Sequence, residues 1–178
     1  MATPESSLSS RLRDARWGLV LSLLTILFGF GLGGAFGAAE DSLKQRLRDG
    51  ASGAKDTIYA GDEAKMNAVV DKSWAYLKRA HLHGGAIGAV ALGATLLTAA
   101  LRRPGRRTRA GVSLALGAGG LGYALFWLLA GFSAPSLGGT GPAKDAFEWL
   151  AVPSAGLLLL GIVAVLVLTV RDLFTDPV

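Results

Sequence analysis

The sequence predicts an all-α integral membrane protein, a four-helix antiparallel bundle with a protruding extramembrane helical hairpin. Four long apolar stretches contain no Asp, Glu, Lys or Arg. Each has about 20 residues or more, the length that an α-helix needs to cross roughly 30 Å of hydrocarbon. The chain of 178 residues is 51% hydrophobic and 17% charged, and it has no cysteine. This composition excludes a disordered chain and a disulfide-stapled secreted module.

The four spans belong to one predicted membrane domain, residues 1–178. They are residues 17–39, 80–101, 110–132 and 149–170. A basic stretch precedes the first span, as it does in secretory signal peptides. The apolar core of a signal peptide usually has about 7–15 residues, fewer than this span, so we expect the segment to be retained.

Basic residues flank the spans unevenly. The side that holds both termini has nine Lys and Arg and four acids, whereas the other side has nine of each. The difference, 9 − 4 = +5 against 9 − 9 = 0, places the whole net charge of +5 on one side. The positive-inside rule then predicts cytoplasmic N- and C-termini, with residues 40–79 and 133–148 outside. Attraction to anionic lipid accounts for the basic pI, so we expect no nucleic-acid partner.

The first outer segment, residues 40–79, is predicted to be an extramembrane helical hairpin. Leu43 and Leu47 extend the first span by two turns, the tip falls at residues 50–53, and one long helix runs from about Asp62 to Leu101. An apolar stripe at helical spacing comprises Met66, Val69, Val70, Trp74 and Leu77. Such a stripe packs against the chain itself or binds a partner protein, and both alternatives remain open.

Two further patterns concern loops and helix contacts. The second outer loop is a Gly- and Pro-rich connection that enters the fourth helix at Lys144 or Asp145. Glycines recur at four-residue spacing in the first two spans, at Gly29, Gly33, Gly37, Gly84 and Gly88. This spacing allows helices to approach closely, either within the chain or between copies of it. The expected partners are therefore the lipid bilayer and a membrane protein or a second copy.

The chain has only two histidines, His81 and His83, and both lie at the outer start of the second span. Histidine entering a span is a candidate functional residue, because lipid cannot satisfy its ring nitrogens. Positions i and i+2 of a regular helix point about 200° apart, so the pair cannot clamp one ion. A ligand elsewhere, a distorted helix start or a site between subunits remains open. Candidate oxygen ligands for a metal are Glu40, Asp41, Asp145 and Glu148.

Residues 80–90 form an AHxHxxxxGxV run. The run resembles one in small membrane proteins similar to the histidine-bearing helix of haem–copper oxidase subunit I. The Asn and aromatic residues common in that run are replaced here by Gly84 and Ala89. The resemblance implies a respiratory-chain context, with His81 or His83 near a haem, copper or quinone, and does not imply oxygen reduction by this chain.

Three classes of function follow. The first is a membrane protein that holds a haem, a metal or a quinone at the histidines. The second is a cofactor-free structural or assembly subunit of a membrane complex. The third, an oligomeric transporter or channel, is disfavoured because the spans contain only scattered Ser, Thr and Tyr as polar groups. No nucleophile–base pair is visible in the spans, so an enzyme is not expected.

Overall fold

The computed structural model describes residues 7–175, and within them every regular element is an α-helix. The helices are α1 (Leu8–Asp14), α2 (Arg16–Ser52), α3 (Glu63–Ala100), α4 (Arg106–Ser133), α5 (Thr140–Ala146) and α6 (Glu148–Phe174). By length and composition, four of them, α2, α3, α4 and α6, could cross a membrane. Three of the predicted apolar segments lie within one of these helices, and the fourth, residues 80–101, passes the end of α3 by one residue, so the all-α prediction is confirmed.

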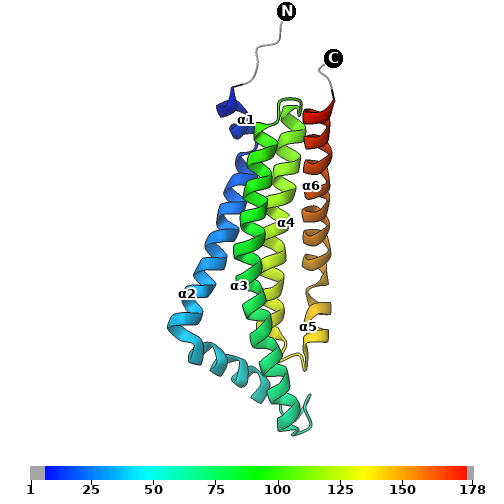
Figure 1. The fold of residues 1–178 in the computed structure, drawn as a ribbon. Helices are drawn as coiled ribbons and strands as arrows, with labels where there is room; N and C mark the ends of the chain where they lie inside the picture. Colours follow the sequence, from blue (N-terminus) through cyan, green and yellow to red (C-terminus); the bar gives the residue numbers. More distant parts are fainter. Residues whose placement is uncertain (1–6, 176–178) are drawn as a thin grey trace, which may run out of the picture.

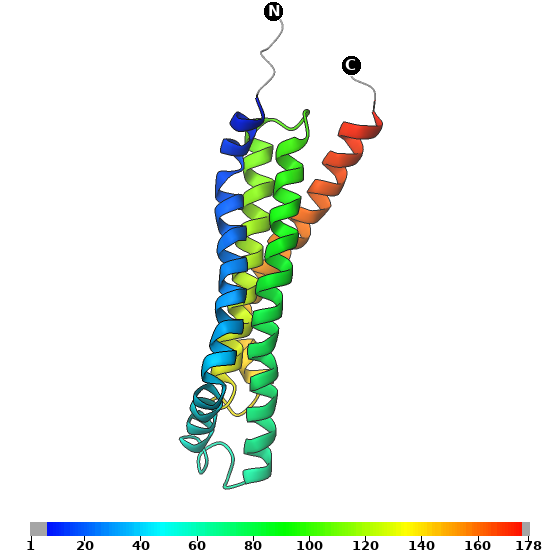
Figure 2. The same cartoon turned by 60° about the vertical axis from the view of Figure 1, so that its left-hand side comes forward.

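The long helices lie beside one another along the length of the molecule (Figure 1). α1, the α3–α4 turn and the C-terminal end of α6 lie at one end, and α5 and the α2–α3 connection lie at the other (Figure 1). α2, α3 and α4 pack closely together, whereas α6 packs mainly on α4. α6 diverges from α3 toward its C-terminal end (Figure 2). Much of the α6 surface therefore faces outward.

α2 contains a kink that the sequence did not predict. Ala39 has non-helical dihedral angles, φ −143° and ψ 29°. Beyond it the helix turns toward α3 (Figure 1). We call residues 40–52 the α2 arm. Leu47 and Ala51 of the arm are buried. The helix continues through Gly50 and ends at Ser52. The predicted tip at residues 50–53 is therefore wrong, and residues 53–62 connect the arm to α3.

α3 confirms the prediction of one long helix. It begins with the Asp62 side chain accepting a hydrogen bond from the Lys65 N–H at 2.9 Å, and it continues without interruption to Ala100. The last long helix does not begin at Lys144 or Asp145 as predicted. A short helix, α5, comes first, and a break at Phe147 leaves Glu148 in the first turn of α6 but places Asp145 in α5.

Glycines bring the helix backbones together. A Cβ atom on Gly84 would lie 2.7 Å from the Gly29 Cα, and one on Gly88 would lie 2.9 Å from the Ile26 backbone nitrogen. Neither position can accept a side chain without moving α2 away from α3. Gly37, in contrast, has no neighbouring atom within 4 Å of such a Cβ. The glycines at four-residue spacing thus lie where α2 and α3 are in close contact, with the exception of Gly37.

The α2 arm, residues 53–62 and the first four turns of α3 form a head at one end of the bundle. Its buried cluster also includes residues of α4 and of the loop after it. The predicted apolar stripe belongs to this cluster: Val69, Val70 and Leu77 are buried, and Met66 and Trp74 pack against them. The stripe therefore contacts the chain itself, which is the local-packing alternative.

Candidate functional site

His81 lies in the contact between α3 and α2. Its Nδ1 is 2.7 Å from the Gly29 carbonyl oxygen, an arrangement in which a protonated Nδ1 donates the hydrogen bond. The ring stands edge-on to Phe36, with centroids 5.9 Å apart. It also covers Gly33, where an added Cβ would lie 2.7 Å from Cε1. His81 is thus a polar link between two helices that Gly29 and Gly33 bring close.

His83 faces α4 instead. Its ring centroid is 5.4 Å from that of Tyr123 and 5.9 Å from that of Trp127. One turn earlier on α3, the Arg79 guanidinium lies over the Trp127 ring at 5.0 Å and over the Tyr76 ring at 5.2 Å. We call Tyr76, Arg79, His83, Tyr123 and Trp127 the His83 cluster. The two histidines therefore contact different helices, as their i, i+2 spacing requires.

The His83 cluster contains an unsatisfied donor. Within the described part of the chain, the buried indole Nε1 of Trp127 has no hydrogen-bond partner. His83 itself is half-buried. Most buried polar groups in proteins have a partner, and an exception calls for an explanation such as a missing water or ligand.

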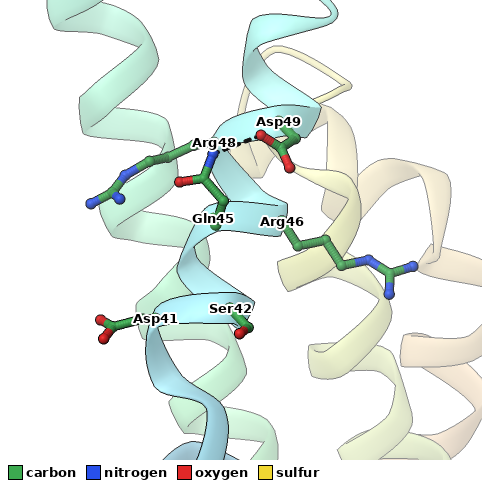
Figure 3. Close-up of a pocket in the computed structure, with 6 residues that line it drawn as sticks. All are labelled: Asp41, Ser42, Gln45, Arg46, Arg48 and Asp49. Carbon is green, nitrogen blue, oxygen red and sulfur yellow. Dashed lines mark hydrogen bonds between the residues drawn. The ribbon is translucent and has the colours of Figure 1, made fainter.

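The acidic residues suggested as metal ligands lie elsewhere. Glu40 is exposed and forms an ion pair with Lys44 at 2.5 Å. Asp41 lies on the exposed face of the α2 arm, where Gln45 donates a hydrogen bond to Asp49 at 2.8 Å (Figure 3). Glu148 is exposed at the start of α6. Between residues 7 and 175, no group of three or more His, Asp or Glu side chains could hold a metal ion.

The contacts of the two histidines bear differently on a haem, a metal ion and a quinone, the three ligands considered for them. A haem between α2 and α3 does not fit, because the helix backbones meet at Gly29 and Gly84 and His81 already binds the Gly29 carbonyl. A metal ion lacks a converging ligand set in the described chain. The His83 cluster combines aromatic faces, an imidazole and an indole N–H donor without a partner in the described chain, and these groups can stack on a flat ring and donate hydrogen bonds to it.

A second polar centre lies at the opposite end of the bundle. Arg109 of α4 is buried, and its Nη2 donates to the Leu101 carbonyl at 3.1 Å. Its Nη1 lies 3.3 Å from the Asp14 carboxylate. Arg11 donates to the Ala100 carbonyl at 3.0 Å. These arginines satisfy carbonyls that the C-terminal end of α3 would otherwise leave unpaired.

The sequence analysis did not predict the buried Arg109 or its pairing with Asp14, because it assigned Arg109 to the basic connection before the third apolar segment. A signal was nevertheless present. An arginine in the first turn of a helix opposes the helix dipole and therefore calls for a compensating carboxylate. The residue that supplies it, Asp14, lies far away in the sequence.

A buried hydrogen bond joins the α2–α3 connection to the loop between α4 and α5. The Tyr59 hydroxyl donates to the Pro135 carbonyl at 2.6 Å, and burial raises the pKa of Tyr59. We expect Tyr59→Phe to lower the free energy of unfolding by about 1 kcal/mol, the usual contribution of such a bond. Unfolding in detergent monitored by circular dichroism measures the change.

The pKa direction also predicts a pH dependence. Because the folded state favours neutral Tyr59, its contribution to stability should be complete below about pH 10, the ordinary tyrosine pKa, and should fall as pH rises through the folded pKa. Absorbance titration should show one late-ionising tyrosine that is missing in Tyr59→Phe. A titration curve that Tyr59→Phe leaves unchanged at its high-pH end would contradict this expectation.

No family model, curated protein or solved structure matches the chain. The resemblance of residues 80–90 to the oxidase helix stays a prediction, since none of these comparisons bears on it.

Proposed function

We propose that the chain is an integral membrane protein of four antiparallel spans that binds the ring of a quinone-type amphiphile at the His83 cluster. Four helices of suitable length and hydropathy support the insertion. The positive-inside rule favours a cytoplasmic location for α1 and the end of α6, and an outer location for the head. The resemblance of residues 80–90 favours a respiratory context for such a ligand.

The observation that carries the proposal is a half-buried histidine whose ring packs against Trp127, the indole N–H of which has no partner in the described chain. Quinone carbonyls accept hydrogen bonds, so a ring placed at His83 could receive one from the imidazole and one from Trp127 after a small side-chain adjustment. The Tyr123 ring offers a stacking surface. Because the cluster lies at the outer end of an apolar segment, the head group would sit near the interface and its tail among the lipid chains.

Tryptophan fluorescence tests this assignment. A short-chain ubiquinone analogue titrated into the detergent-purified protein should quench the emission of Trp127 in a saturable manner. We expect His83→Ala to weaken the binding by about tenfold, since it removes one charge-free hydrogen bond and a ring contact. Leu82→Ala, at an exposed neighbour on the same helix, is the matched control and should bind like the wild type.

The opposite results would overturn the proposal. These are non-saturable quenching in the wild type, or equal affinities for His83→Ala and wild type. An absorption spectrum of the oxidised and dithionite-reduced protein, with metal analysis, provides an independent check. A Soret band or stoichiometric copper lost in His81→Ala would favour the haem or metal alternative instead.

The second candidate is a cofactor-free structural or assembly subunit. The charged outer face of the α2 arm favours it, because this face is exposed on a head whose apolar residues are already packed internally (Figure 3). The natural absence of cysteine allows single-site cross-linking. Under this alternative, Gln45→Cys in native membranes should cross-link to one partner in stoichiometric yield, whereas Leu82→Cys should not.

A further inference from the structure

A small cavity lies at the end of the bundle opposite the His83 cluster. Its volume is about 190 Å³, and it lies between the α3–α4 turn and the last turns of α6. It is lined by Arg103, Pro104, Gly105, Thr108, Leu168 and Arg171. The divergence of α6 from α3 separates these elements here (Figure 2).

One wall of the cavity is cationic and rich in donors. Arg171 contributes an exposed guanidinium from α6, and Thr108 contributes a hydroxyl from the first turn of α4. The contacts of Arg103 include a hydrogen bond from its backbone N–H to Asp172 at 2.8 Å and one from its Nη2 to the Thr175 carbonyl at 2.6 Å. Guanidinium groups and hydroxyls are the donors that bind phosphate oxygens.

The other wall is apolar and continues into the lipid-facing surface. Leu168 and Pro104 line the cavity itself. Val163, Val167 and Val170 leave neighbouring parts of α6 exposed and uncharged. A phosphate beside the arginines could therefore remain covalently attached to acyl chains that lie along α6. This junction of charge and apolar surface is what a phospholipid requires.

The surrounding acids are already engaged. Asp14 interacts with Arg109 and Arg106, at 3.3 and 3.5 Å. Asp172 accepts backbone hydrogen bonds from Arg102 and Arg103. Asp14 is therefore balanced by two arginines, whereas Asp172 keeps its charge, and the described arginines at this end outnumber the two carboxylates. The nine arginines of the basic side all come from the elements that meet at this end (Figure 1).

We propose that this cavity binds the phosphate of an anionic phospholipid, with the acyl chains lying along the exposed face of α6. The inference shares with the proposed function only the insertion of the long helices into a bilayer. The quinone-type site lies at the other end of the bundle, so either site can fail while the other is observed.

Native mass spectrometry of the detergent-purified protein tests this site. With phosphatidylglycerol we expect one retained lipid per chain, and with phosphatidylcholine none. Arg171→Gln should weaken phosphatidylglycerol binding by about fivefold or more. Arg107→Gln removes an equal charge from an exposed position at the same end that does not line the cavity, and it should bind like the wild type.

Two further arms complete the test. Leu168→Trp keeps every charge but should reduce lipid binding by filling the cavity. It therefore tests the site independently if the arginine variant does not fold. Inorganic phosphate at millimolar concentration should not displace the lipid. Equal losses in Arg171→Gln and Arg107→Gln would show diffuse attraction and overturn the site. Full displacement by inorganic phosphate would overturn the assignment to a lipid.

Discussion

Gly29→Val is expected to destabilise the bundle by about 3 kcal/mol, the upper range for overpacking a closely packed site. A Cβ at this position would lie 2.7 Å from the backbone carbonyl carbon of Gly84. Neither backbone can rotate away as a side chain could, so α2 and α3 must separate. That separation also lengthens the hydrogen bond between His81 and the Gly29 carbonyl.

Gly31→Val provides the matched control. It makes the same chemical change on the same helix, but a Cβ there meets nothing within 4 Å. Intrinsic helix propensity favours valine over glycine at both positions by a few tenths of a kcal/mol, so this contribution cancels in the comparison. Unfolding by sodium dodecyl sulfate, followed by circular dichroism, measures both variants. Equal midpoints would contradict the close α2–α3 contact.

Arg109→Met is expected to cost about 3 kcal/mol, because it removes the buried guanidinium that pairs with Asp14 and donates to two backbone carbonyls. The Asp14 carboxylate would keep only Arg106, an exposed side chain at 3.5 Å. The Leu101 and Thr98 carbonyls would lose the donors that now lie at 3.1 and 3.4 Å. Methionine preserves much of the side-chain volume, so the loss is mainly polar.

Arg107→Met is the control, because Arg107 is exposed two residues away on the same helix. It should change the free energy of unfolding by less than about 0.5 kcal/mol, as is usual for surface positions. Combining Asp14→Asn with Arg109→Met should cost less than the sum of the single changes, because the two groups share one interaction. Strict additivity would show that Asp14 and Arg109 act independently.

The sequence by itself determined the number and approximate limits of the long helices. An uninterrupted apolar run has the same meaning wherever the rest of the chain lies, so residues 17–39 and 149–170 could be located without tertiary information. The continuity of α3 was predictable from another local pattern, the apolar stripe at helical spacing that leads into the second apolar run. The separation of His81 from His83 also followed from the helix period, before any neighbour was known.

Tertiary structure decided which neighbour each of these residues has. The sequence placed His81 and His83 as a candidate site, but only helix packing sets one against Gly29 and the other against Tyr123. The kink at Ala39, the burial of the apolar stripe and the pairing of Arg109 with Asp14 have the same origin. Each depends on contacts between residues distant in the chain, and the local apolar and helical patterns contain no information about which faces meet.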